Sequence, residues 1–402
     1  MTLQLLDHPD VPPRPAGCEV RARLDRATAL FPELAEKYRS LVGDGGPVEI
    51  DRLPPMSVDE LRRSVWGGIR TGLSRDRGAV LYLGGGTAEN PSATLVPSGL
   101  FGADILADWH PLGAADVLLN LSRGTRLWPV HDLCNSLAAL SGSSTIPYGS
   151  PETGDFAEWV DFFARCGANA LAADTPTLRE LLSFCRSTGR SLDWLRTLVW
   201  VGSGLDEVTA AMVRTVVPQA RVWGLYGSVE SWAVAGNGPD CPRNVFHPLP
   251  HQYVEVLDGE ILVSTIHDRA ITPLLRYRTG DTGEFTRCPC GSGRPALRLL
   301  GRLEDVLSFR GERFSRAELT RLACEVDGVL DADARVLDRG ASTERLQLRV
   351  RLREGVPADR YQEEWIRECV LGSHLTLGRV AAGAQESVEV EIGRSARGAA
   401  AA

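Results

Sequence analysis

Between residues 100 and 225 the chain alternates short apolar segments, which are typical of buried strands, with segments that are typical of helices. The strand candidates are DVLLNLS, NALAA and TLVWVGSG, and the helix candidates are residues 131–141, 155–166, 176–188 and 206–217. A strand, a helix and a second strand in succession form a βαβ unit, whose two strands are parallel. The alternation therefore predicts an α/β fold built on a mostly parallel sheet.

The segments on either side of this region have other patterns. Helices are expected over residues 21–41 and 57–74. Residues 252–287 are typical of short strands, with a hairpin turn at Asp258-Gly259. After Gly301 the order β-β-α-β-α-β predicts a compact α+β unit.

The length of 402 residues suits two domains rather than one. We expect a large domain over residues 1–301, with βαβ-type sheets and a small β subdomain. Residues 302–402 are expected to form a small, mobile C-terminal domain.

Composition excludes several classes of protein. The net charge of −8 is spread along the chain, which argues against nucleic acid as a partner. No segment has the roughly 20 consecutive apolar residues of a membrane span, and the N-terminus lacks a secretory signal pattern. The number of cysteines, nine, is odd, so they cannot all be paired in a framework of disulfide bonds. These features predict a cytoplasmic protein with no membrane or nucleic-acid partner.

Three segments that follow strand candidates carry residues suited to ligand binding. An open glycine-rich loop is expected over Gly84–Ser92, and it could bring backbone N–H groups and the Thr87 hydroxyl close to a phosphate. Residues 202–204, Gly-Ser-Gly, lie where ligands bind at the carboxyl edge of a parallel sheet. The segment WGLYGSVES supplies a ring, a close-approach glycine, a hydroxyl and a carboxylate. Each segment alone is also consistent with an ordinary turn.

Asp281, in YRTGD, is placed after a strand, where a carboxylate could accept two ribose hydroxyl protons. The alternative is a simple Asp-Gly connection. Nearby, Cys288 and Cys290 are close enough to share a metal, and Cys241 and His247 complete a Cys3His zinc set. His251 is a competing ligand, and four unrelated residues remain the alternative interpretation.

Taken in order, these segments resemble the adenylate-forming enzymes, which include acyl-CoA synthetases, firefly luciferase and peptide-synthetase adenylation domains. The phenylacetate–CoA ligase-like branch is the most similar, including compact acyl-adenylating proteins of phenazine antibiotic biosynthesis. The resemblance covers roughly residues 80–325 and rests on YGSVE, YRTGD and GRLEDVLSFRG as a series.

The resemblance implies roles for these residues toward ATP or AMP. Gly202, Ser203 and Gly204 would line the adenine, Tyr226 would stack on it, and Asp281 would bind the ribose.

The phosphates and Mg²⁺ would be held by other residues of the same segments. The predicted contacts are Gly85, Gly86, Thr87, Gly227, Ser228 and Glu230, with Glu230 at the Mg²⁺.

Four further residues are assigned by resemblance to the C-terminal part of the chain. Arg302 would reach the ribose or a phosphate, and Glu304 would be the hinge. The family's C-terminal catalytic lysine has no counterpart, since Lys37 is the sole lysine. Arg394 or Arg397 could supply a positive charge in its place. The resemblance also implies that the Cys3His set holds a structural Zn²⁺.

The predicted activity is ATP-dependent conversion of a carboxylic acid, aryl or otherwise cyclic, to an acyl-AMP in secondary metabolism. The acceptor would be CoA, a carrier-protein thiol or an amine, and a homodimer is left open. Candidates to line an acyl pocket are Trp109, His110, Trp128, His131 and Trp232. The missing lysine, together with Glu89 in the phosphate segment, motivates an alternative: a non-adenylating homologue that binds nucleotide or acyl ligand as a partner protein. Chemistry on an unusual nucleophile, such as N–N bond formation, is a third option.

Overall fold

The computed structural model describes residues 11–42, 45–70, 72, 78–87, 90–124, 127–152, 154–303, 306–310, 312–338, 343–382 and 387–393. The chain divides into two compact units, Met1–Leu300 and Gly301–Ala402. The roles expected for the two parts, and the mobility of the second, remain predictions.

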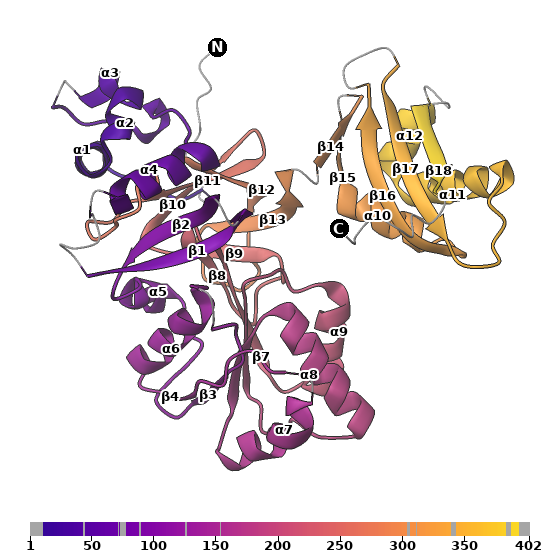
Figure 1. Ribbon diagram of the computed structural model, residues 1–402, viewed down its shortest axis with the longest axis horizontal. Coiled ribbons are helices and arrows are strands. Elements are labelled where there is room, and N and C mark those ends of the chain that lie inside the picture. The colour runs from indigo at the N-terminus through magenta and orange to yellow at the C-terminus, as the bar shows by residue number, and fades with distance from the viewer. Residues whose placement is uncertain are drawn as a thin grey trace. The chain divides into compact units, whose positions relative to one another are not determined.

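A mixed sheet forms the centre of the first unit (Figure 1). Among the described residues it has eleven strands, in the order β10-β11-β12-β13-β9-β8-β7-β6-β5-β3-β4. The parallel part consists of β3 (Val117–Asn120), β4 (Ser144–Ile146), β5 (Ala170–Ala173), β6 (Thr197–Val201) and β7 (Arg221–Ser228). The mostly parallel sheet predicted for this region is confirmed.

Helices cover both faces of the parallel strands (Figure 1). One face carries α5 (Gly102–Asp108) and α6 (Val130–Leu140), and the other carries α7 (Asp155–Arg165), α8 (Thr175–Thr188) and α9 (Glu207–Val216). The last four helices lie within a residue of their predicted bounds. Asp174 and Asp206 accept hydrogen bonds from backbone N–H groups in the first turns of α8 and α9, which fixes where these helices begin.

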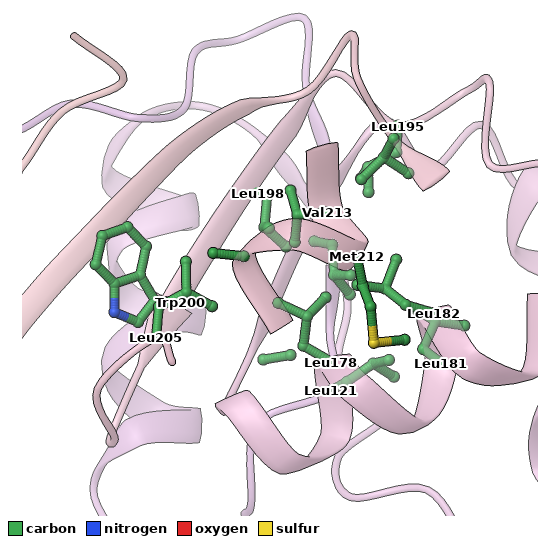
Figure 2. Close-up of a cluster of buried hydrophobic side chains, with 14 of the residues drawn as sticks. Leu121, Leu178, Leu181, Leu182, Leu195, Leu198, Trp200, Leu205, Met212 and Val213 are labelled. Carbon is green, nitrogen blue, oxygen red and sulfur yellow. The ribbon is translucent and has the colours of Figure 1, made fainter. Parts of the chain in front are cut away.

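The central strands β5 and β6 are buried along their whole length and almost entirely apolar, because both faces of the sheet are covered there. In β6, Leu198 and Trp200 face the core under α7–α9, whereas Val199 and Val201 face the core under α5 and α6. Figure 2 shows the first of these cores, where leucines of α8 meet Leu198 and Trp200. Strand β6 is therefore packed on both faces, and β7 pairs with it along Arg221–Leu225.

The remaining strands of the sheet are antiparallel and include the predicted small β subdomain. They are β8 (Trp232–Asn237), β9 (Val245–Pro248), β10 (Gln252–Leu257), β11 (Glu260–Thr265), β12 (Tyr277–Thr286) and β13 (Ala296–Arg302). Asp258 and Gly259 form the turn between β10 and β11, both with positive φ, as their place in the sequence predicted.

The glycine-rich segment lies in a separate hairpin of β1 (Ala79–Thr87) and β2 (Asn90–Pro97). The prediction of an open loop over Gly84–Ser92 was wrong. Gly86 pairs with Pro91 and Thr87 with Asn90, after an irregularity in the register between Leu83 and Gly86.

The predicted helix over residues 21–41 is broken. The structure has α1 (Gly17–Leu30), α2 (Pro32–Lys37) and α3 (Arg39–Val42), followed by η1 (Ile50–Arg52) and α4 (Val58–Arg70). Pro32 has no N–H to donate, so it ends α1 and begins the next helix at its first position. These helices pack on apolar residues of β2, β10 and β12.

The second unit has its own core. Its elements are β14 (Val306–Phe309), β15 (Glu312–Ser315), α10 (Arg316–Cys324), β16 (Val329–Leu337), β17 (Arg345–Leu352), α11 (Arg360–Ser373), α12 (Leu375–Ala382) and β18 (Val388–Ile392). Strands β16, β17 and β18 form one sheet, with β18 parallel to β17. The predicted α+β character is confirmed, and α12 is an additional helix.

Candidate functional site

Tyr226 and Asp281 meet, although 55 positions separate them in the sequence. The Tyr226 hydroxyl donates a hydrogen bond of 2.7 Å to Oδ2 of Asp281. Strands β7 and β12 are separated in the sheet by β8, β9 and β13, so the sheet curves until their side chains touch. The backbone N–H of Asp281 donates to Thr279 Oγ1, which orients the carboxylate-bearing residue.

The Gly-Ser-Gly segment lies at the same edge of the sheet. Val201 of β6 pairs with Leu225 of β7, so the next residues, Gly202 and Tyr226, are neighbours. Gly202 has φ +77°, a conformation that favours glycine.

Thr175 holds this segment in place. Its backbone N–H donates to Ser203 Oγ at 3.2 Å, and its hydroxyl donates to the Gly204 carbonyl at 2.9 Å. The exposed segment is therefore fixed beside the Tyr226 ring, as an adenine-binding wall requires.

The turn between β7 and β8 carries the predicted phosphate and Mg²⁺ residues. Ser228 and Ser231 hydrogen bond to each other through their hydroxyls at 3.0 Å, and each hydroxyl accepts from the other residue's backbone N–H. A Cβ at Gly227 would lie 1.9 Å from the Trp232 carbonyl oxygen, so only glycine fits there. Glu230 is half-buried and makes no hydrogen bond or ion pair with any described residue. Its carboxylate can therefore serve a cation.

The glycine-rich strand lies against this turn. A Cβ at Gly84 would be 3.0 Å from Cβ of Val229, so β1 approaches the turn closely. Gly85, Gly86 and Thr87 follow in β1, which brings the predicted phosphate contacts to the same neighbourhood. Glu89 is outside the described residues.

Four other predicted residues belong to the C-terminal part of the chain. Arg302 is exposed at the end of β13 and belongs to the second unit. Glu304, Arg394 and Arg397 lie outside the described residues. Their assigned roles stay predictions.

The four predicted metal ligands converge. The ligand atoms of Cys241, His247, Cys288 and Cys290 all lie within 4.8 Å of one another. The His247 Nδ1–H donates to the Pro295 carbonyl at 2.9 Å, which turns Nε2 toward Cys290 Sγ, 3.3 Å away.

Electrostatics at this cluster favours a cation. Burial, with a contribution from the neighbouring Cys288, raises the pKa of the Cys241 thiol to about 12. A cation among the thiols would remove this penalty and favour the thiolates.

His251, the competing ligand, is not in the cluster. It is buried, and its ring stacks on Phe101 with centroids 4.9 Å apart. Neither ring nitrogen has a hydrogen-bond partner among the described residues.

Two of the acyl-pocket candidates are core residues instead. Trp109 and Trp232 are buried under α5 and α6, and their indole N–H groups donate to the carbonyls of Asn237 and Leu100. His110 is exposed. Trp128 and His131 are half-buried; Trp128 packs on the edge of the same core, and His131 Nδ1–H donates to the Ser122 carbonyl.

The sequence analysis missed the residues that hold the turn. The Gln252 side-chain amide donates to the carbonyls of Ser231 and Ala233, each at 3.0 Å, and is itself buried. The only signal in the sequence is the presence of a glutamine in a strand of mostly apolar residues. This signal does not indicate which groups the glutamine binds.

No protein-family model matches the chain. The 2-hydroxy-7-methoxy-5-methyl-1-naphthoate–CoA ligase of Streptomyces carzinostaticus is 32% identical over 143 residues. The match spans 36% of this chain and 21% of that enzyme.

Solved CoA ligases share the fold. The open conformation of 2-hydroxyisobutyryl-CoA ligase, in complex with 2-HIB-AMP and CoA, superimposes with a TM-score of 0.69 at 16% identity. The superposition covers 96% of this chain and 89% of the chain of that ligase. ATP-bound MatB from Rhodopseudomonas palustris gives 0.56 at 17% identity, over 80% of this chain and 67% of that one. The chain therefore has the fold of these CoA ligases, as the sequence predicted. Within the described residues no helix is long and apolar enough to span a membrane.

Proposed function

We propose that this protein is an ATP-dependent acid–CoA ligase. A carboxylate oxygen of the acid would attack the α-phosphorus of ATP, and the bond to pyrophosphate would break, giving acyl-AMP. The thiol of CoA would then take the acyl group and release AMP. The observation that carries the proposal is the contact of Tyr226 with Asp281 beside the Gly202 segment.

These residues suit an adenosine monophosphate. The Tyr226 ring and residues 202–204 offer two walls for adenine, and the Asp281 carboxylate offers acceptors for the ribose hydroxyls. Ser228 and the glycine-rich strand would take the phosphates. The first half-reaction needs mainly positioning and charge stabilisation, which such a rigid edge can supply.

Glu230 would hold Mg²⁺, which would neutralise phosphate charge when bound. Arg302, Arg394 and Arg397 would add positive charge from the second unit, with Glu304 as the hinge. Glu230 belongs to the β7–β8 turn, beside Ser228, which supports its proposed role. The roles of the three arginines and of Glu304 are supported by the resemblance alone.

The acyl group would bind on the α6 side of the sheet. Half-buried apolar side chains gather there: Trp128, Val130, Trp223 and Leu225. Val130 also lies next to Gly202, 3.7 Å from where a Cβ would be, which connects this surface to the nucleotide edge.

The finer parts of the proposal concern the substrates and setting. They are an aryl or cyclic acid, a carrier thiol or amine as alternative acceptor, a homodimer, a cytoplasmic location and a role in antibiotic biosynthesis. The relative that acts on a naphthoate supports an aromatic acid.

Pyrophosphate exchange tests the activity. The acids should include a hydroxynaphthoate, benzoates and 2-hydroxyisobutyrate, followed by thioester assays with CoA. Exchange with an aromatic acid and acyl-CoA formation are expected. No exchange with any acid, together with no ATP binding by calorimetry, would overturn the proposal.

The Cys3His cluster would bind structural Zn²⁺. A tetrahedral zinc–thiolate site puts sulfur atoms about 3.8 Å apart, so the observed set needs only a small contraction around the ion. The His247–Pro295 hydrogen bond supplies the outer contact that zinc-bound histidines usually have. The ion would join β9 to the turn between β12 and β13.

A second candidate is a non-adenylating homologue that binds nucleotide as a partner protein. Lys37 supports it, because its ammonium is used structurally and bonds to the Pro55 carbonyl and Glu60, both at 2.8 Å. An Arg394→Lys or Arg397→Lys variant separates the two. A large gain in exchange from an inactive protein favours the second candidate, and an already active protein excludes it.

A further inference from the structure

Trp232 occupies a strained position at the end of the β7–β8 turn. Its φ is +60°, which is rare for a bulky residue and costs free energy. The surrounding structure enforces it, because Gln252 holds the carbonyls of Ser231 and Ala233 on either side. Backbone strain that the surrounding structure maintains in this way indicates that the direction of the Trp232 side chain has a role.

The Trp232 indole contacts β1 of the glycine-rich hairpin and the segment that follows β2. Its ring stacks on Tyr82 of β1, with centroids 5.4 Å apart and 24° between planes. Its N–H donates a 3.0 Å hydrogen bond to the carbonyl of Leu100, three residues after β2 ends. One side chain of the turn is thus joined to β1 and to the segment just after the hairpin.

Tyr82 is fixed in turn from the other side. Its hydroxyl donates to Asp132 of α6 at 3.1 Å. Burial and the Asp132 carboxylate raise the pKa of Tyr82, so the hydroxyl keeps its proton and remains a donor. Two residues beyond Tyr82, Gly84 lies against Val229 in the middle of the turn. Few degrees of freedom remain between the glycine-rich strand and Ser228.

We infer that Trp232 and Tyr82 are positioning residues that set the distance between the glycine-rich strand and the Ser228–Glu230 turn. This inference rests on the proposed function. The triphosphate of ATP must contact the glycine-rich strand and the Ser228–Glu230 turn at once. AMP binding requires only contacts with Tyr226, Asp281 and Ser228. Loosening the contact between Trp232 and Tyr82 should therefore weaken the binding of ATP and leave the binding of AMP unchanged.

Tyr82→Phe and Trp232→Phe test this in the full chain, since each removes one hydrogen-bond donor and keeps a ring. Trp109→Phe is the matched control: it lies in the same core, but its indole N–H donates to the backbone carbonyl of Asn237 in β8 rather than to the hairpin or the segment after it. Calorimetry gives the Kd for ATP and for AMP, and a thermal melt gives Tm for each variant.

A lost hydrogen bond of ordinary strength corresponds to about fivefold in affinity. The ratio of the ATP Kd to the AMP Kd should rise about fivefold in both test variants. In Trp109→Phe the ratio should stay at the wild-type value, even where Tm falls as much.

An unchanged ratio in Tyr82→Phe, or an equal rise in the Trp109 control, overturns the inference. Tyr82→Phe keeps the test decisive if Trp232→Phe does not fold. A wild-type protein that binds neither nucleotide is a different result, since it removes the proposed function itself.

Discussion

In the proposed function, Asp281 is the residue that would bind the ribose of the nucleotide. Its carboxylate accepts a hydrogen bond from Tyr226, and ribose hydroxyls are donors of the kind that a carboxylate binds. Hydrogen bonds to a charged group contribute about 1.5–3 kcal/mol. Asp281→Ala should therefore weaken AMP binding by roughly ten- to a hundredfold.

Calorimetry with AMP and with 2′,3′-dideoxy-AMP checks this assignment. The wild type should prefer AMP, and the variant should bind both equally. If the variant still prefers AMP, the ribose hydroxyls bind elsewhere.

His251 should make the protein sensitive to acid. Burial, with a smaller contribution from His267, lowers its pKa from 6.5 to about 4, against the opposing effect of Asp104. Between these values the unfolded chain binds a proton that the folded chain does not, so stability falls as the pH decreases from 6.5 toward 4. The loss between pH 7 and pH 5 should be about 2 kcal/mol.

Urea denaturation of wild type and His251→Phe at the two pH values measures this loss. Phenylalanine keeps the stacking on Phe101 and removes the titrating group, so the variant should lose about 2 kcal/mol less than wild type. His110→Phe, at an exposed position, is the control and should behave as wild type. Equal losses in His251→Phe and wild type would contradict the assignment.

At the scale of elements, the Cys3His cluster should stabilise the β12–β13 turn. Cys288→Ser should lower the zinc content from about one ion per chain to near zero and reduce Tm by about 5–10 °C. Since Asp281 lies in β12, AMP binding should weaken as well. Metal analysis, thermal melts and calorimetry measure these effects.

Cys166→Ser is the matched control, because Cys166 is an exposed thiol outside the cluster. Two results together would rule out a metal role: no zinc in wild-type protein purified without chelator, and the same Tm for Cys288→Ser as for the wild type.

Two elements show where local pattern misleads. The glycines at 84–86 have low strand propensity, yet pairing with β2 places them in a strand with an irregular register. The apolar spacing across residues 21–41 suits one helix, but Pro32 divides it. In the first case a long-range packing partner, Val229, selects the small residues.

For the whole molecule, Gly301 lies at the junction of the two units with φ +132°, a conformation that side chains disfavour. If the second unit must move between the two half-reactions, Gly301→Ala should slow acyl transfer to CoA about tenfold through strain of about 1–3 kcal/mol. Pyrophosphate exchange should change less.

Parallel assays of exchange and thioester formation measure this partition. Gly355→Ala is the matched control, because Gly355 also has positive φ and open space but lies within the second unit. An equal effect on both half-reactions, or the same partition in the control, would argue against a hinge at this junction.

The sequence by itself determined the helices and strands of the βαβ region, the α+β character of the second unit and the order of the site motifs. Apolar periodicity, caps such as Asp174 and turns such as Asp258-Gly259 act within a few residues, so they can be read locally. The Cys3His set could also be predicted, because its spacing and ligand chemistry are specific.

Only the tertiary structure decided which segments meet. Sheet order and curvature bring Tyr226 to Asp281, and the β1–β2 hairpin to the turn at Trp232. The sequence suggested Trp109 and Trp232 as residues that line an acyl pocket, but the tertiary structure buries both in the core. These outcomes depend on contacts between residues 50 to 150 positions apart, and a local pattern carries no information about such pairings.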